Sequence, residues 1–461
     1  MKIPFLSFIL MPILITLTFI NSEYLIYLLI FFLSLQSTVI FNIGHYGFQV
    51  YRFITILLSI LLIFKIINKF KLSIKVSYLK SIIVIGAIFF IYATFISSIG
   101  PFLFEGHIVN SVKGMGLYSH LHFNKYNIAY QSFLWLYFFV LIYILQKKYS
   151  DKFIKRLIMV FYFSITFVFL IAFLQFLIPF GFPDIFKIIN NTSERNLNRL
   201  SPMGIGRFVR VSATFLEPSM FAPFVVGVLS ISLDKLFKKF SFNWLFVFFI
   251  ALFFNITSTS TTAYVASFIM IFIITGSRFL RNSKKIITNT IKKMMIIFTI
   301  IMAGLLIVIV KFPDILSSIY KLLELYIIYK SKTGSFHQRT AADSFAVFHV
   351  FPHSYFLGVG LGSNRPSSLV PFLLSTVGII GFILFFIFIY KIFKFCKDNL
   401  KDTPYSSFIY LIVAIILSMG IAYPDITNPT LWQFIYFSII LAKYNYDKKV
   451  EATKTVLKYG F

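Results

Sequence analysis

Six of the ten arginines lie in two polar segments between long apolar stretches, and they are the residues best suited to chemistry. A guanidinium is planar and always charged, and it binds phosphate through two parallel hydrogen bonds. The clustering therefore predicts an anion site, and a diphosphate held at the edge of a bilayer would call for this residue type. The six are Arg195, Arg199, Arg207, Arg210, Arg339 and Arg365.

The alternative is that these arginines pair with Glu194, Glu217 and Asp343 and only order their loops. Glu217 is the most interesting of these acids because Pro218 follows it and suits the first position of a helix. A carboxylate at a helix start is favoured by the helix dipole, so capping is an alternative to any chemical role for Glu217.

Histidines and acids lie in or beside connections that the charge pattern assigns to the outer side. The pairs His120/His122 and His349/His353 have spacings that suggest a metal, but Pro352 interrupts the second and no cysteine or acid completes either. We therefore expect no metal site, and a neutral imidazole is better interpreted as a general base. The acids form no D-x-D pair, so arginine rather than magnesium would stabilise a phosphate leaving group.

The composition is that of a polytopic α-helical membrane protein. The 461 residues are 59% hydrophobic and 13% charged, with a mean hydropathy of +0.87. The apolar runs do not alternate with polar residues, which excludes a membrane β-barrel. The net charge of +28 lies mostly in short connections, so we expect no nucleic-acid partner. We expect one integral membrane domain over 1–461, and Cys396 is alone, so no intrachain disulfide can form.

Thirteen apolar stretches predict an all-α transmembrane bundle of about 12–13 spans. They are 3–20, 24–41, 50–68, 79–99, 128–145, 157–179, 216–233, 242–257, 261–277, 294–311, 367–390, 406–422 and 430–443. Thirteen crossings with an internal C-terminus would start the chain outside. The alternative is that one of the first two stretches is re-entrant or broken.

Lysine-rich connections orient these spans, because cytoplasmic loops carry the excess of lysine and arginine. Those at 65–80, 147–156, 235–239, 278–293 and 391–401, and the tail from Lys443, are predicted to be cytoplasmic. The outward connections are then 100–127, 180–215, 312–366 and 423–429, with "TSTST" at 257–261 as an outward turn. We expect 180–215 and 312–366 to be large, functional loops.

A glycine-rich stretch, "GVGLGS" at 358–363, superficially resembles a phosphate loop. It lacks the G-K-[ST] ending and the flanking strand, so we reject that interpretation. We expect its glycines to let the backbone pass close to lipid, substrate or neighbouring helices. Gly378 and Gly381 in the following span would allow close helix packing.

These motifs together resemble a known family. An arginine about twenty residues before a Pro/His segment, then "GVGLGS", a polar turn and a helix with "GIIG", resembles the O-antigen polymerase/ligase superfamily. The stretch "RVSATFLEPSMFAPF" at 210–224 resembles the upstream signature of Wzy-type polymerases. The resemblance covers most of the chain in its organisation.

The resemblance implies a multi-pass glycosyltransferase of the bacterial cytoplasmic membrane, with its active site facing the periplasm. Such an enzyme transfers a glycan from undecaprenyl diphosphate to a lipid-linked repeat unit, without nucleotide, cofactor or essential metal. The product would be O-antigen, capsule or other exopolysaccharide. Implied partners are the lipid-linked oligosaccharide, membrane lipid, a chain-length regulator and a flippase.

The resemblance also suggests roles for individual residues. Arg210 and Arg339 would hold the diphosphate and stabilise the charge on it as it leaves, with Arg207 and Arg365 secondary. Glu217, or failing that His353 or His337, would remove the proton of the acceptor hydroxyl.

Other functions remain as alternatives. A ligase of the same superfamily would use lipid A–core as acceptor, but ligases typically carry a histidine where this chain has "NRPSSLVPF". A flippase or transporter of lipid-linked oligosaccharides would place charges within its spans, where only Arg52 stands well inside the early ones. A channel or structural membrane protein, and a membrane acyltransferase, are further alternatives.

Overall fold

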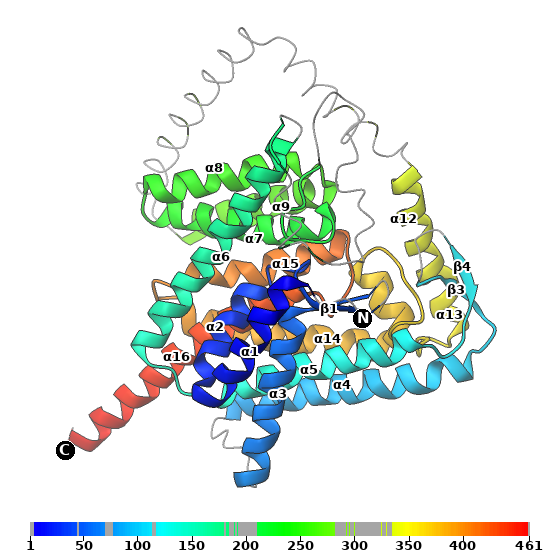
Figure 1. Ribbon diagram of the computed structural model, residues 1–461, viewed down its shortest axis with the longest axis horizontal. Helices are drawn as coiled ribbons and strands as arrows, with labels where there is room; N and C mark the ends of the chain where they lie inside the picture. Colours follow the sequence, from blue (N-terminus) through cyan, green and yellow to red (C-terminus); the bar gives the residue numbers. More distant parts are fainter. Residues whose placement is uncertain are drawn as a thin grey trace.

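The computed structural model describes residues 4–43, 46–69, 77–112, 117–178, 181–183, 210–281 and 334–459, with a few isolated positions between them. Within these ranges the chain is mainly helical, and the helices pack into a bundle (Figure 1). Most of the predicted stretch 294–311 and of the predicted loop 180–215 lies outside the described residues. Arg207 lies outside them too.

Most of the described helices overlap the predicted apolar stretches, and α8 has the bounds predicted for it, but α12 and α13 lie within the predicted loop 312–366 and α16 runs well beyond its predicted end. The described helices are α1 (Phe5–Ile20), α2 (Ser22–Phe32), α3 (Val50–Lys69), α4 (Ser77–Leu103), α5 (Lys125–Gln146), α6 (Asp151–Leu177), α7 (Pro218–Lys238), α8 (Phe242–Thr257), α9 (Thr261–Arg281), α12 (Gly334–Phe345), α13 (Phe351–His353), α14 (Leu369–Leu400), α15 (Ile409–Ile421) and α16 (Pro429–Tyr459). A π-helical turn, Ala346–Val350, joins α12 to α13.

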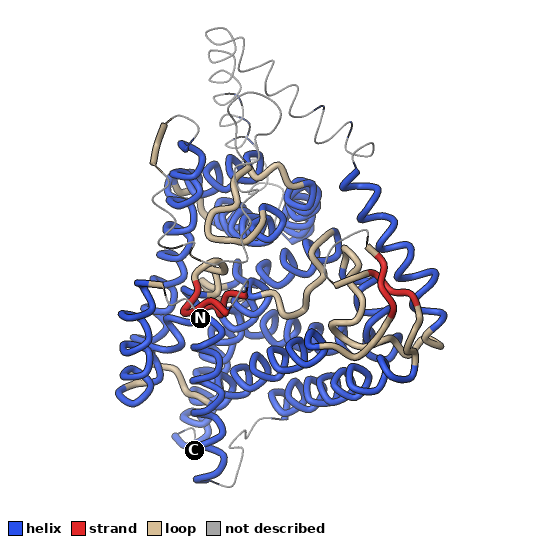
Figure 2. The backbone as a smooth tube through the Cα atoms, turned by 45° about the vertical axis from the view of Figure 1, so that its right-hand side comes forward, coloured by secondary structure: helices blue, strands red, loops and turns tan. Residues whose placement is uncertain are grey.

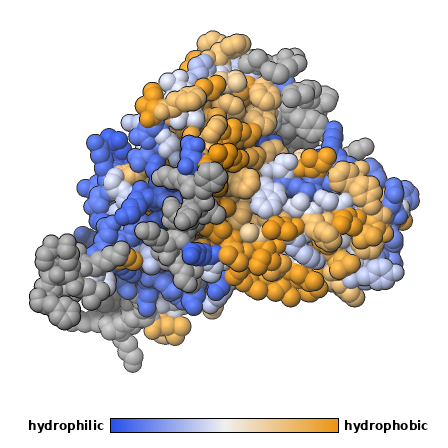
Figure 3. Space-filling view, turned by 90° about the horizontal axis from the view of Figure 1, so that it is seen from below, coloured by the Kyte–Doolittle hydropathy of each residue, from blue (hydrophilic) through white to orange (hydrophobic). Residues whose placement is uncertain are grey.

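The described helices confirm a polytopic, membrane-embedded helical protein. Seven of them are long and apolar enough to cross a membrane, and four shorter apolar helices accompany them. Hydrophobic residues cover much of the middle of the face in Figure 3, whereas hydrophilic residues gather toward its left side. Helix α7 is almost wholly buried, and it packs against α8, α9 and α15. The total of 12–13 spans stays a prediction.

Two short hairpins depart from the all-α prediction. Strand β1 (Val39–Ile43) pairs with β2 (Tyr46–Gln49), and β3 (Ile108–Asn110) pairs with β4 (Tyr118–His120), both antiparallel. Figure 2 shows them as two separate red segments on different sides of the bundle.

The predicted span 24–41 is broken, as one of our two alternatives for the N-terminus allowed. Helix α2 has 11 residues, about 17 Å of helix against a bilayer core of about 30 Å. Polar residues end it: the Ser37 N–H donates to the Thr214 carbonyl at 3.0 Å, and the Thr214 hydroxyl donates to the Ser34 carbonyl at 2.6 Å. Thr214, a residue distant in the chain, therefore supplies hydrogen-bond partners to the backbone N–H and carbonyl groups where the helix stops.

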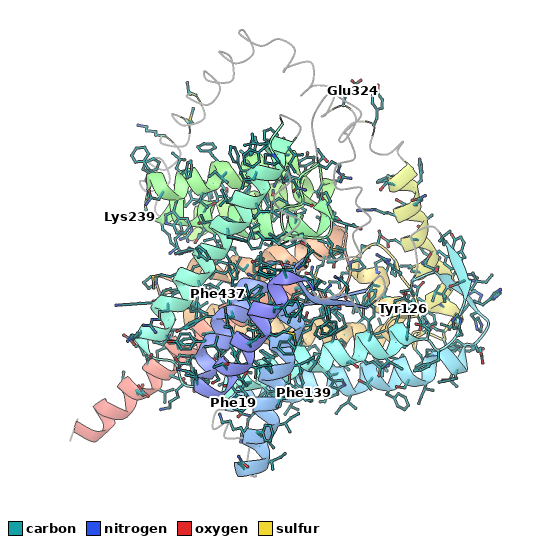
Figure 4. The ribbon with its side chains drawn as sticks, in the orientation of Figure 1. Phe19, Tyr126, Phe139, Lys239, Glu324 and Phe437 are labelled. Carbon is teal, nitrogen blue, oxygen red and sulfur yellow. The ribbon has the colours of Figure 1, made fainter. Side chains whose placement is uncertain are left out.

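Among the described residues, contacts join several lysine-rich connections to one another and to neighbouring helix ends. Ion pairs and hydrogen bonds between them are Lys147–Glu23 at 3.6 Å, Lys148–Glu451 at 3.2 Å, Lys448–Asp151 at 3.0 Å, and Lys235 to the Pro404 carbonyl at 2.8 Å. In Figure 4, Lys239 after α7 and Tyr126 near the start of α5 mark opposite ends of the molecule. We call these the lysine end and the far end.

Helix α14 is interrupted near the far end. Gly378 has φ 67° and ψ −173°, so the chain leaves the helix there and resumes it at once. The Ile379 N–H consequently donates to the Phe356 carbonyl at 3.0 Å instead of to its own helix. Only glycine adopts such a backbone conformation without strain.

The glycine segment, residues 358–363, takes up the carbonyl groups that this break releases. The N–H groups of Val359 and Gly360 donate to the carbonyls of Ser375 and Thr376 at 2.9 and 2.8 Å. The segment is buried, and Gly100 of α4 lies directly against it. We predicted that these glycines let the backbone pass close to lipid, substrate or neighbouring helices. The structure shows the close approach to a neighbouring helix, α4.

We predict that Gly378→Ala destabilises the protein. A Cβ at this position would overlap the carbonyl oxygens of Phe356 and Leu357, and the left-handed conformation alone costs about 1–3 kcal/mol. The detergent-solubilised variant should unfold at a lower temperature than wild type. Gly420→Ala is the control, because no atom lies within 4 Å of its new Cβ. Equal unfolding temperatures for the two variants would contradict the prediction.

Candidate functional site

Two of the predicted arginines, Arg339 and Arg365, lie on adjoining elements at the far end. Arg339 is on α12, and Arg365 is in the turn that joins the glycine segment to α14. The Ser367 hydroxyl lies 3.5 Å from the Arg339 carbonyl oxygen, so the two elements touch between the arginines. The structure thus places two arginines that are 26 positions apart in the chain on adjoining elements.

Asp343 fastens α12 to the start of α14. Its carboxylate accepts from the N–H and hydroxyl of Ser367 at 2.6 and 2.9 Å, and from those of Ser368 at 3.1 and 2.8 Å. Ser368 is the N-cap of α14, so the carboxylate also lies at the positive end of that helix. Asp343 therefore orders this region through serines, and not through an arginine as our structural alternative supposed.

The guanidinium groups of these two arginines retain unused donors. The Arg339 side chain is half-buried, and its buried Nε has no hydrogen-bond partner within the described ranges. Arg365 donates from Nη1 to the Val112 carbonyl at 3.1 Å. A guanidinium carries five N–H donors. Within the described residues the Arg339 Nε is buried and one Arg365 Nη1 donor is bonded, so the Nη groups that keep exposed surface are the donors that an anion could reach.

A cluster of polar and charged side chains around Asp425, which we did not predict from the sequence, adjoins Arg365. Asp425 lies between α15 and α16, and its neighbour Tyr423 donates its N–H to the Ser367 carbonyl at 2.9 Å. Burial raises the pKa of the Asp425 carboxyl above its ordinary value, and bonds from Thr427 and the charges of Arg52 and Arg365 offset part of the rise. Asp425 keeps part of its surface exposed.

Arg52 and Tyr130 complete this cluster from two further helices. Arg52 starts α3 and stacks on Phe133, with its Cζ 4.0 Å from the ring centroid. The Tyr130 hydroxyl of α5 lies 3.4 Å from Asp425 Oδ2. The sequence did carry one signal for each charged member. Arg52 is the charge that we placed well inside an early span, although the structure puts it in the first turn of α3, and Asp425 is the only acid of its short connection.

Arg210 lies apart from the Arg339–Arg365 pair. Its Nε donates to the Thr259 hydroxyl at 2.8 Å, in the turn between α8 and α9 that we predicted at 257–261. Residues 211–215 behind it are buried, and Gln175 accepts from two of their backbone N–H groups. This contact favours the ordering role for Arg210, and no contact within the described ranges joins Arg210 to Arg339.

Glu217 is the N-cap residue of α7, but its side chain caps no backbone N–H group. The exposed carboxylate accepts from the Ser219 hydroxyl at 3.1 Å. Glu217 also lies near the Asp425 cluster. Burial raises the pKa of Tyr423, and the charge of Glu217 is one of several nearby that add to the rise. Simple capping, our alternative for Glu217, is therefore not what its side chain does.

The predicted histidines fall into two places. His353, His349 and His107 form a group, with ring centroids 4.2 Å apart for His353–His349 and 6.4 Å for His353–His107. The His353 Nδ1–H donates to the His349 carbonyl at 2.6 Å. Burial lowers the pKa of His349, with the two neighbouring imidazoles adding to the effect. His337 is exposed on α12, away from this group.

The described residues contain no cluster of three or more His, Cys, Asp or Glu side chains arranged to hold a metal ion. Comparison with known proteins does not assign a family, because no protein-family model and no curated protein matches the chain. The geometry of the Arg339–Arg365 pair and the Asp425 cluster is therefore the basis for any functional assignment.

We predict that Asp343→Asn lowers the stability of the far end. An amide keeps one acceptor but faces four donors, and a buried donor left unpaired costs about 1–3 kcal/mol. Thermal unfolding in detergent should shift to lower temperature. The control is Glu105→Gln, an exposed carboxylate at the same end. An unchanged unfolding temperature for Asp343→Asn would show that these bonds do not hold the junction.

Proposed function

We propose that the chain is a polysaccharide polymerase that transfers a glycan from undecaprenyl diphosphate to a lipid-linked repeat unit. The observation that carries this proposal is the Arg339–Arg365 pair, whose guanidinium donors are mostly unused. A pair of forked cations on two fastened elements matches the two phosphates of such a donor. The product would be O-antigen, capsule or another exopolysaccharide.

The position of the pair in the bundle supports the same reaction. It lies at the far end, and the positive-inside rule makes the lysine end cytoplasmic. The site would then face the outer side of the bacterial cytoplasmic membrane, where lipid-linked repeat units are joined. The long apolar helices would give the lipid tail of the donor access from within the bilayer.

The chemical contribution of the arginines is stabilisation of the leaving group. As the bond between the sugar and the diphosphate breaks, negative charge grows on the departing oxygen. Hydrogen bonds to charged groups contribute about 1.5–3 kcal/mol each, and more is gained where they strengthen in the transition state. Asp343 fastens together the two elements that carry Arg339 and Arg365, which limits the movement of these elements during the reaction.

We predict that Arg339→Lys and Arg365→Lys each abolish long-chain polymer while leaving the protein inserted. Lysine keeps the charge but loses the fork, so one of two parallel hydrogen bonds to a phosphate is lost. Gels of long-chain glycan from a complemented deletion strain measure the effect, and immunoblots of membranes check insertion. The control is Arg156→Lys, an exposed arginine near the lysine end. Full-length polymer from both variants would refute the role of the pair.

A reconstitution in detergent distinguishes the polymerase from a flippase. The lipid-linked repeat units that accumulate in a strain lacking the gene are extracted and added to the purified chain. Detergent micelles have no second leaflet, so a flippase has nothing to do there, whereas a polymerase lengthens the glycan. We predict ladders of two or more repeat units. Repeat units that stay single would contradict the proposed function.

A further inference from the structure

The connection that carries Asp425 is fixed against the site. The Tyr423 N–H donates to the Ser367 carbonyl at 2.9 Å, and the Trp432 Nε1–H donates to the Ile426 carbonyl at 3.0 Å. Tyr423 has φ 69°, an uncommon conformation for a residue other than glycine. Such local strain persists only where surrounding contacts enforce it, and it concentrates at functional sites.

The Asp425 carboxylate has one engaged oxygen and one nearly open oxygen. Oδ1 accepts from the N–H and the hydroxyl of Thr427 at 2.8 and 2.7 Å. Oδ2 lies 3.4 Å from the Tyr130 hydroxyl, longer than the usual 2.5–3.0 Å of a hydroxyl hydrogen bond. The side chain is therefore oriented by Thr427 while Oδ2 can accept another proton donor.

Other candidate bases at the far end are less suited. Asp343 already accepts four hydrogen bonds. Glu217 and His337 are exposed to solvent, and no contact in the described ranges links either side chain to the two arginines. His353 donates its Nδ1–H within the histidine group, and no contact in the described ranges links it to the arginines.

We propose that Asp425 is the general base that activates the acceptor hydroxyl, an inference that rests on the proposed function. The acceptor O–H proton passes to Oδ2, and the acceptor oxygen forms a bond to the anomeric carbon. The bond from that carbon to the phosphate oxygen breaks, and its electron pair leaves with the diphosphate. Arg339 and Arg365 bind the charge on the leaving group.

The surroundings of Asp425 suit this task. A base is most effective when its pKa approaches the working pH, and burial moves the pKa of Asp425 in that direction. The hydrogen bonds from Thr427 and the charges of Arg52 and Arg365 favour the ionised form of Asp425 and offset part of the rise in its pKa that burial causes. Tyr130 and Tyr423 also face Asp425, Tyr137 interacts with its charge, and Tyr51 and Glu217 lie close to Tyr423.

The first test is Asp425→Asn, assayed in detergent with repeat units extracted from the deletion strain. The amide preserves shape and can still accept from Thr427, but it cannot take a proton. We expect kcat to fall about 10²–10⁴-fold, the usual contribution of a general base, with little change in KM. The acid limb of the pH–rate profile should disappear. Glu105→Gln is the matched control and should behave as wild type.

The second test, Thr427→Val, leaves Asp425 in place. A hydrogen bond to a carboxylate lowers its pKa, so losing the Thr427 hydroxyl should raise the pKa of Asp425. The acid limb of kcat/KM should therefore move to higher pH. A purely structural role for Asp425 would lower the yield or stability of both variants without moving this limb, so Thr427→Val decides the question even if Asp425→Asn fails to fold.

The outcomes separate the two proposals. If wild type lengthens the glycan but Asp425→Asn keeps its kcat and its acid limb, the base is another group and only this inference fails. Loss of the acid limb in Glu217→Gln instead would identify that group as Glu217. If wild type does not lengthen the glycan, the proposed function fails first.

Discussion

Backbone N–H and carbonyl groups inside a bilayer need hydrogen-bond partners from the protein. The break in α14 at Gly378 frees several such groups, and other segments of the chain must bond them. The released carbonyls of Ser375 and Thr376 are taken by the glycine segment, which is thereby drawn into the bundle against α4. The turn that follows presents Arg365, and the next residues bind Asp343 of α12 and Tyr423 of the last connection. The arrangement of charged groups at the far end thus follows from one interrupted helix.

The two ends of the bundle use charge differently. At the lysine end, exposed or half-buried lysines pair with acids on neighbouring helix ends, contacts that contribute little stability individually but are consistent with orientation of the chain. At the far end, Arg339 and Arg365 are half-buried, and within the described residues no carboxylate pairs with either of them. Positive charge at the lysine end is thus consistent with a role in orienting the chain in the membrane, whereas Arg339 and Arg365 at the far end keep donors that a ligand could use.

Sequence reasoning located helices well because membrane thickness sets how long an apolar run must be; α3 and α8 follow their predicted ranges within a residue. It failed where partners came from distant positions. The apolar run through Ile40 concealed the end of α2, since Thr214 supplies the partners that let the helix stop. The cluster around Asp425 was not predictable either, because Arg52 and Tyr130 reach it only through tertiary packing.

The N-terminal hairpin α1–α2 has a consequence for how the protein is made. Ser34 and Ser37 bind Thr214, which lies 180 and 177 residues further along the chain. While a ribosome is still producing α3 to α6, these polar groups have no native partner in the bilayer. The end of α2 can therefore take its native hydrogen-bonded form only after the segment before α7 has been made.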